Sequence, residues 1–173
     1  MSSKLSRILS MGWITLTCFV LVGCSENRTE KTGTTALPKV AYITNGIASF
    51  WTFAEKGAAD AAQKFNADVN IQMPANGVED QKRICQDLLA QGIDGIAISP
   101  IDPENQGDLL SEIAQRTKLI THDSDAPESE RLCYIGMDNY TAGRMCGQLV
   151  KEAMPEGGSV MIFVGRLGQA NSR

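Results

Sequence analysis

The sequence predicts an α/β fold, a doubly wound and mainly parallel sheet with helices on both faces. From residue 39 onward, short apolar runs typical of buried strands alternate with helix-length amphipathic segments. The connections between them are short, which fits right-handed strand–helix–strand crossovers. Sixteen glycines in 173 residues suit a fold with many tight turns. The length fits one such domain and a fraction of a second.

Each predicted strand is a short apolar run, and each predicted helix has apolar residues on one face. The first helix carries an apolar stripe that includes Ala58 and Phe65. In the last helix we expect Met145, Leu149 and Val150 to face inward. Strands are predicted at residues 40–44, 69–73, 95–99, 119–121, 132–137 and 159–164, the last of them buried, and helices at 51–66, 77–91, 104–116 and 140–154.

The N-terminal segment has the organisation of an export signal. Lys4 and Arg7 precede an apolar run that ends in small residues before Cys24. This pattern resembles a bacterial lipoprotein signal over residues 1–23, and the resemblance implies that Cys24 becomes a diacylated membrane anchor. An uncleaved transmembrane helix is the alternative interpretation of the same run. Residues 24–38 are polar and aperiodic, which predicts a flexible tether.

Composition and motifs argue against several functional classes. A net charge of −4 argues against a nucleic-acid partner, because no basic stripe is present to neutralise phosphates. The chain has no GxGxxG, GxxxxGK[ST], GxSxG or HExxH motif. We therefore predict no cofactor, no metal and no enzyme activity. Cys85, Cys133 and Cys146 lack CxxC spacing and are predicted to be buried structural thiols.

The densest group of polar side chains follows the strand predicted at 119–121. His122, Asp123, Ser124 and Asp125 would emerge at its carboxyl end, where open α/β sheets bind their ligands. A metal site at this histidine and the two aspartates is one alternative interpretation, but hard cations recruit more oxygen ligands than two carboxylates offer. An acid/base pair of the two aspartates is another, although such loop acids are usually solvated.

Five motifs occur in a fixed order along the chain. They are KVAYITNGIASFW at residues 39–51, GIAISP at 95–100, LITHDSDA at 119–126, YIGMDNYTAG at 134–143 and GRLGQANSR at 165–173. In order and spacing the chain resembles the periplasmic sugar-binding proteins of ABC transporters, and the ribose-binding type in particular. The resemblance implies two similar α/β lobes joined by a hinge, with a sugar held in the cleft between them.

The same resemblance implies the domain organisation. Residues 39–137 correspond to the first lobe, and the chain crosses into the second lobe at the hinge residues Asp138 and Asn139. Residues 138–173 correspond to the opening of a second lobe. We therefore expect the sequence to be a fragment of a longer protein.

Three candidate ligand-binding residues match the family's pattern directly. Phe50 and Trp51 stand where the family places aromatic side chains that stack on the sugar ring. Asp123 stands where the family has a carboxylate that accepts hydrogen bonds from two sugar hydroxyls. The resemblance thus implies an aromatic and a carboxylate side to the cleft.

Four further candidates are implied, and two of them, Asn45 and Ser124, depart from the family's pattern. Arg173 matches the family's sugar-binding arginine at the start of the second lobe. Asn45 is a candidate from the first loop, although the family asparagine lies a few positions later. Ser124 stands where ribose binders have an arginine, and Asp125 is the residue expected to compensate. These departures favour a sugar other than ribose.

The implied function is ligand delivery without chemistry. A monosaccharide that contacts both lobes would shift the protein toward a closed form, which an ABC transporter permease recognises. We expect a monomer in the periplasm or cell envelope, attached to the membrane through its lipid. A sensor protein coupled to a chemoreceptor or kinase is an alternative, and a flavodoxin-like or Rossmann-like nucleotide-binding enzyme is a third interpretation. The loop at residues 45–49 has one glycine, which disfavours phosphate binding.

Overall fold

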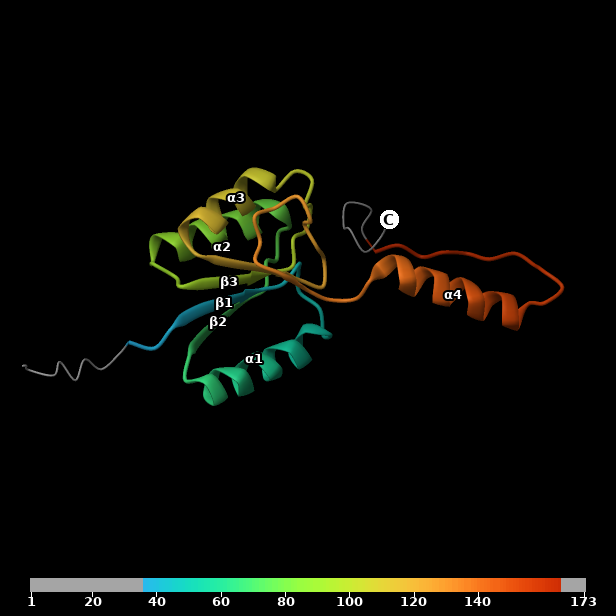
Figure 1. Cartoon of the computed structure of the whole chain (residues 1–173), viewed down its shortest axis with the longest axis horizontal. Coiled ribbons are helices and arrows are strands. Elements are labelled where there is room, and N and C mark those ends of the chain that lie inside the picture. The colour runs from blue at the N-terminus through green and yellow to red at the C-terminus, as the bar shows by residue number, and fades with distance from the viewer. Residues whose placement is uncertain (1–35, 166–173) are drawn as a thin grey trace, which may run out of the picture. The chain divides into compact units, whose positions relative to one another are not determined.

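The computed structural model describes residues 36–165. Strands and helices alternate through most of this part, as predicted (Figure 1). Cys24 and Arg173 lie outside the described residues, so the lipid anchor and the second-lobe arginine stay predictions. The elements are β1 (Lys39–Ile43), α1 (Trp51–Phe65), β2 (Asp68–Gln72), α2 (Val78–Ala90), β3 (Gly95–Ile98), α3 (Gly107–Arg116), β4 (Lys118–His122), β5 (Tyr134–Ile135) and α4 (Asn139–Ala153).

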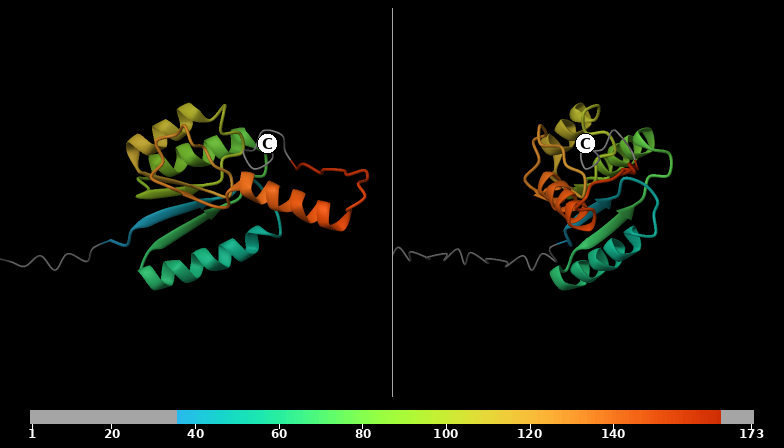
Figure 2. Two further views of the ribbon diagram at one scale, coloured as in Figure 1. Left: turned by 45° about the vertical axis from the view of Figure 1, so that its right-hand side comes forward. Right: turned by 90° about the vertical axis from the view of Figure 1, so that its right-hand side faces the viewer.

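The strands form one parallel sheet in the order β2-β1-β3-β4-β5. Helices α2 and α3 cover one face of this sheet, and α1 lies on the other (Figures 1 and 2). The predicted α/β class and the parallel arrangement are therefore confirmed. In a parallel sheet the carboxyl ends of all strands meet at one edge, which brings the loops after β1, β3 and β4 together.

The hydrophobic core lies between the sheet and helices α2 and α3. Alternate strand residues point to this face, including Ile43, Ile98 and Leu119, each at most 1% exposed. Leu110 and Ile113 of α3 are fully buried against them. Full burial of such a side chain stabilises the fold by about 1.5–3 kcal/mol, so this face holds the molecule together.

Local signals explain why α2 begins where it does. Gly77 precedes the helix with φ of 75°, a conformation that glycine adopts without steric strain. Glu79 and Asp80 lie in the first turn, where negative charge is favourable near the helix N-terminus. The Asp80 carboxylate also accepts a 2.9 Å hydrogen bond from the backbone N–H of Ala75. These contacts fix the entry of the chain into α2.

The sequence predicted the last helix, but it was wrong about the buried face of that helix and about the strand after it. Residues 159–164 form no strand, and side chains such as Ile162 and Phe163 are 83% and 88% exposed. Helix α4 forms, but it buries no residue, and Met145 and Leu149 are 65% and 64% exposed instead of facing inward. An apolar pattern indicates which face of a segment is suited to packing against another element. Among the described residues, no element covers the apolar faces of α4 and of residues 159–164.

Smaller departures from the sequence prediction occur in α1, at two cysteines and at the start of α3. The stripe of α1 is only partly covered, because Ala58 is half-buried and Phe65 is 71% exposed. Cys85 is buried as predicted, whereas Cys133 and Cys146 are exposed, and all three are free thiols. Helix α3 begins later than predicted, because a turn-rich connection precedes Gly107. Within residues 36–165, no helix is both long and apolar enough to span a membrane.

Candidate functional site

A hollow of about 430 Å³ opens where β1 and β4 end and α1 begins. Phe50 and Trp51 line it from the start of α1, and Asp123 lines it from the end of β4. The sequence prediction placed these three side chains around one ligand, and the structure brings them to one cavity. We call this cavity the Asp123 hollow. Its other lining residues are Tyr42, Ala54, Ala97, Ile120, His122, Ile135, Gly136, Met137 and Asn139.

The Asp123 carboxylate is held in one orientation by two side-chain donors. Asn45 Nδ2 and Ser99 Oγ each donate to its Oδ2 atom at 3.0 Å, and Asn45 Nδ2 also lies 3.1 Å from Ser99 Oγ. Because each carboxylate oxygen has about two acceptor sites, Oδ1 keeps its capacity for further donors. Asp123 also has φ of 58°, an uncommon value for a residue with a side chain. The carboxylate is thus pre-positioned as an acceptor.

The two aromatic rings of the hollow differ in exposure. Trp51 is only 5% exposed and packs edge-on against Tyr42, with ring centroids 6.4 Å apart. Phe50 is 63% exposed and meets Trp51 edge-to-face at 5.1 Å. Trp51 therefore forms part of the floor, whereas Phe50 offers an accessible apolar surface at the side of the hollow.

His122, which is buried, and Tyr42, which is half-buried, form a stacked pair in the lining of the hollow. Their ring centroids lie 4.2 Å apart with an interplanar angle of 17°. His122 Nε2 is 3.2 Å from the carbonyl oxygen of Ile43, which can only accept, so Nε2 carries the proton and Nδ1 accepts from the Tyr42 hydroxyl at 3.1 Å. Burial lowers the pKa of His122 to about 4, so the ring is neutral at physiological pH.

The pKa of the Tyr42 hydroxyl is raised, whereas that of His122 is lowered. Burial raises the pKa of Tyr42, and the negative charge of Asp123 raises it further. Both rings are thus uncharged near neutral pH. The Asp123 carboxylate is therefore the charged group among the residues that line the hollow.

The structure separates Asp125 from Asp123. Arg131 binds the Asp125 carboxylate with two donors, Nε to Oδ1 at 2.6 Å and Nη2 to Oδ2 at 2.8 Å, and Thr121 Oγ1 donates to Oδ1 at 2.7 Å. Partial burial by itself would raise the pKa of Asp125, but these hydrogen bonds outweigh it and hold that pKa below its usual value. Ser124, between the two aspartates, is fully buried.

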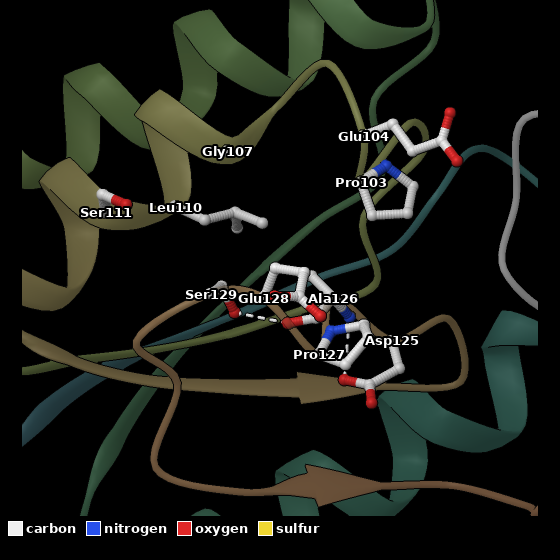
Figure 3. Close-up of a pocket in the computed structure, with 10 residues that line it drawn as sticks. All are labelled: Pro103, Glu104, Gly107, Leu110, Ser111, Asp125, Ala126, Pro127, Glu128 and Ser129. Atoms are coloured by element: carbon white, nitrogen blue, oxygen red, sulfur yellow. Dashed lines mark hydrogen bonds between the residues drawn. The ribbon is translucent and has the colours of Figure 1, made fainter.

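Asp125 instead lines a second cavity of about 550 Å³, which we call the Asp125 groove (Figure 3). The groove runs between α3 with its preceding connection and the loop that follows β4. The expectation that Ser124 and Asp125 share one hollow with Asp123 thus has no support in the geometry.

Sequence reasoning missed Ser99 and Tyr42 as parts of the site, and it named His122 only among the polar residues after the strand predicted at 119–121 and as a candidate metal ligand. Ser99 follows β3 directly, and β3 pairs with both β1 and β4. Its place at the end of a predicted central strand was therefore a usable signal. Tyr42 was read only as a strand residue, and its contact with His122, eighty residues later in the chain, depends on the sheet order.

Two predictions concern the end of the first lobe. The Asp138 carboxylate accepts a 3.0 Å hydrogen bond from the backbone N–H of Thr141, which makes it the N-cap of α4. Asn139 opens α4 and lines the Asp123 hollow. The hinge role of both residues stays a prediction. Among residues 36–165, no group of three or more His, Cys, Asp or Glu side chains is placed to hold a metal ion.

Curated relatives of the chain are sugar-binding proteins by name. The ribose import binding protein RbsB of Bacillus subtilis is 25% identical over 170 residues, which cover 92% of this chain and 55% of that protein. The xylose/arabinose-binding protein XylF of Sulfolobus acidocaldarius is 27% identical over 150 residues, 77% of this chain and 36% of that protein. The chain thus spans roughly half or less of their length.

Solved structures and a family model agree with these relatives. An ABC transporter solute-binding protein from Burkholderia graminis, in complex with D-arabinose, aligns with TM-score 0.74 and 34% identity over 78% of this chain and 47% of that one. GanP, a glucose-galactose binding protein from Geobacillus stearothermophilus, aligns with TM-score 0.73 and 27% identity over 79% and 50%. The model of the periplasmic binding protein domain matches residues 40–173. This chain belongs to the periplasmic binding protein domain family.

Proposed function

We propose that the Asp123 hollow binds a monosaccharide and that the protein is the solute-binding component of a sugar ABC transporter. The observation that carries this proposal is the pairing of an oriented carboxylate with an accessible aromatic ring in one cavity. The names of the relatives, which include binders of ribose, arabinose and xylose, support the same class of ligand.

The two sides of the hollow match the two kinds of surface on a sugar ring. The C–H face of the ring is apolar, and an aromatic contact of the Phe50 kind contributes about 0.5–1.5 kcal/mol beyond burial. The hydroxyl rim supplies donors, and each hydrogen bond to a charged acceptor contributes about 1.5–3 kcal/mol. Because Asn45 and Ser99 already fix the Asp123 carboxylate, little side-chain entropy is lost when the sugar binds.

The protein acts by changing shape, without making or breaking a bond. In our proposal the sugar contacts both lobes, so it binds the closed form better than the open form and shifts the population toward closure. The permease recognises the closed form. Closure would turn on Asp138 and Asn139, and Arg173 would contact the sugar from the second lobe.

The N-terminal segment is the basis for the location that we propose for the protein. We place the protein at the periplasmic side of the cell envelope, anchored through acylated Cys24. Incorporation of labelled palmitate by the wild type, but not by the Cys24→Ser variant, tests the anchor. Equal labelling of both proteins would contradict it.

Sugar binding is tested by saturation-transfer NMR, which detects affinities down to the millimolar range. D-Ribose, D-arabinose, D-xylose and D-galactose are titrated into the wild type, Asp123→Asn and the control Asp60→Asn, an exposed aspartate of α1. We expect one or more sugars to bind the wild type and the control equally. Asp123→Asn should weaken binding about tenfold or more, because the charged acceptor is lost.

Two results would contradict the proposal. One is that no sugar of the panel binds the wild type. The other is that Asp123→Asn, shown by circular dichroism to be folded, binds as tightly as Asp60→Asn. The control removes the same charge at an exposed position of α1 that does not line the hollow, so the comparison isolates the position of the carboxylate.

A further inference from the structure

Tyr134 does not line the site proposed for the sugar, but its hydroxyl reaches the backbone of Asp123. The hydroxyl donates to the carbonyl oxygen of Asp123 at 2.8 Å, and the carbonyl oxygen of Met137 is a second, longer acceptor at 3.3 Å. Asp123 and Met137 line the Asp123 hollow from the segments that follow β4 and β5. One side chain therefore connects two walls of the hollow.

The backbone of Asp123 has a left-handed conformation that its surroundings must stabilise. Its φ is 58°, and a residue with a Cβ atom adopts this conformation at an energetic cost that neighbouring contacts offset. The N–H of Asp123 donates to the carbonyl oxygen of Ile135 at 3.1 Å. Strand β5 thus binds both backbone polar groups of Asp123, the N–H through Ile135 and the carbonyl through the side chain of Tyr134.

Gly136 provides the space for the Tyr134 ring. Residues two apart in an extended segment point to the same side, and a Cβ atom on Gly136 would lie 2.1 Å from the Tyr134 hydroxyl oxygen and 2.2 Å from its Cζ atom. These distances are too short for atoms that are not bonded, so a side chain at residue 136 would displace the ring. The absence of a side chain there allows the hydroxyl to reach Asp123.

The Tyr134 hydroxyl keeps its proton at neutral pH and can therefore donate. Burial raises the pKa of Tyr134 most, and the negative charges of Asp125 and Asp123 raise it further. Hydrogen bonds with Asn139 and Met137 lower this pKa, but they are outweighed. Because a backbone carbonyl oxygen can only accept, Tyr134 is the donor in its contact with Asp123.

We infer that Tyr134 is a positioning residue of the sugar site, whose hydroxyl holds Asp123 in its left-handed conformation and so directs the Asp123 carboxylate into the hollow. Asn45 and Ser99 orient this carboxylate through the side chain, and Tyr134 acts on the same residue through the main chain. The effect on sugar binding rests on the proposed function, whereas the effect on the Asp123 backbone needs no ligand.

The first experiment measures the Asp123 backbone by NMR in the sugar-free protein. The amide and Hα protons of one residue lie closer together at a positive φ than at a negative φ, so the nuclear Overhauser effect between them is stronger. In Tyr134→Phe, which loses only the hydroxyl, we expect this signal of Asp123 to weaken. The control Tyr140→Phe makes the same change at a side chain that is 76% exposed and should leave the signal unchanged.

Sugar titrations by saturation-transfer NMR measure the consequence for binding. Tyr134→Phe should raise Kd by about two- to tenfold, the size of one hydrogen bond, and Tyr140→Phe should not change it. Gly136→Ala should raise Kd at least as much, because the displaced ring takes the hydroxyl away from Asp123. The control Gly143→Ala, where an added Cβ atom would meet no neighbouring atom within 4 Å, should leave Kd unchanged.

The double variant Tyr134→Phe/Gly136→Ala separates the hydroxyl from the packing of the ring. Once the ring is displaced, the hydroxyl no longer reaches Asp123, so the double variant should bind no more weakly than Gly136→Ala alone. Additive losses of affinity would mean that the two residues act independently of each other, and they would overturn the inference. Circular dichroism checks that each variant is folded.

The sugar-free measurement keeps this inference separate from the proposed function. An Asp123 signal that is as strong in folded Tyr134→Phe as in the wild type would overturn the inference, and so would equal Kd values for Tyr134→Phe and Tyr140→Phe. If no sugar of the panel binds the wild type, the proposed function fails, and the Asp123 signal still decides whether Tyr134 holds the backbone. If Gly136→Ala does not fold, the two tyrosine variants decide the question.

Discussion

At the scale of single residues, His122 links the ligand hollow to the stability of the fold. The ring is 6% exposed, and both of its nitrogens are hydrogen-bonded, to Tyr42 and to the Ile43 carbonyl. Protonation would put a donor at Nδ1, where the Tyr42 hydroxyl now donates, and would place a charge in a buried site. The folded protein therefore favours neutral histidine, which is why the pKa of His122 is lowered to about 4.

We expect stability to fall between about pH 6.5 and pH 4 because of His122. Above pH 6.5 the histidine is neutral in both the folded and the unfolded state, so its contribution to the free energy of unfolding is fully present. As the pH falls, the unfolded chain binds the proton first, with an ordinary pKa near 6.5, and the free energy of unfolding drops by up to about 3 kcal/mol. Denaturant unfolding of the wild type at pH 7.5, 5.5 and 4.5 measures this slope.

The variant His122→Gln serves as the control for that slope, because it has no titrating group at this position. Its stability should change much less over the same range. Asp80, Asp125 and Asp138 have lowered pKa values, so their contributions are lost mainly below their ordinary value of 3.8. Parallel pH curves for the wild type and His122→Gln would show that the histidine is not the cause.

Sequence reasoning could bring residues together where the order of strands and helices fixes their position. Phe50 and Asp123 follow the ends of β1 and β4, so the parallel arrangement was enough to bring them to one cavity. Asp125 was misplaced, because its side of the loop is decided by Arg131, a long-range pairing within an irregular segment. Loop composition predicts that acids are present but does not predict which cavity each one faces.

At the scale of secondary-structure elements, Gln81 of α2 joins the ends of neighbouring segments. Its Nε2 atom donates to the carbonyl oxygens of Thr44 and Ser99, both at 2.9 Å. Its Oε1 atom accepts from Ile101 N–H at 3.2 Å and from Gln106 Nε2 at 2.9 Å. One fully buried side chain thus provides hydrogen-bond partners for polar groups in the segments after β1 and β3 and just before α3.

We expect Gln81→Met to destabilise the protein by at least about 2 kcal/mol. Methionine fills a similar volume, but it leaves several buried donors and acceptors without partners, and each such group costs about 1–3 kcal/mol. The matched control is Gln86→Met on the exposed side of the same helix, which should change stability by less than about 0.5 kcal/mol. Urea unfolding compares the two, and equal effects would show that the Gln81 hydrogen bonds contribute little.

Elements that pack against the sheet were predictable, and elements without a partner were predictable only in part. The apolar faces of α2 and α3 and the strand runs reinforce one another, because each pattern supplies the surface that the other needs. Helix α4 has an equally periodic pattern and forms, yet it buries nothing. The segment 159–164 has a strand-like composition, but a strand also needs a hydrogen-bonded neighbour.

At the scale of the whole molecule, apolar surface remains exposed that would normally be covered. Parallel sheets are usually buried on both faces, but Tyr42, Ala97 and Ile120, on the α1 face, are only half-buried. They also line a further apolar cavity on this face, of about 370 Å³. The chain spans roughly half the length of the proteins it matches.

Lysine substitutions at Ile162 and Phe163 should therefore reduce exposed apolar surface without weakening the fold. Each should change the free energy of unfolding by less than about 0.5 kcal/mol, since neither side chain is buried. Binding of the dye ANS should fall in the double variant, because the dye reports exposed apolar surface. The matched core change Ile98→Ala, at a position with 0% exposure, should cost about 2–5 kcal/mol. A loss of stability in the lysine variant as large as in Ile98→Ala would show that residues 159–164 pack against the protein in solution.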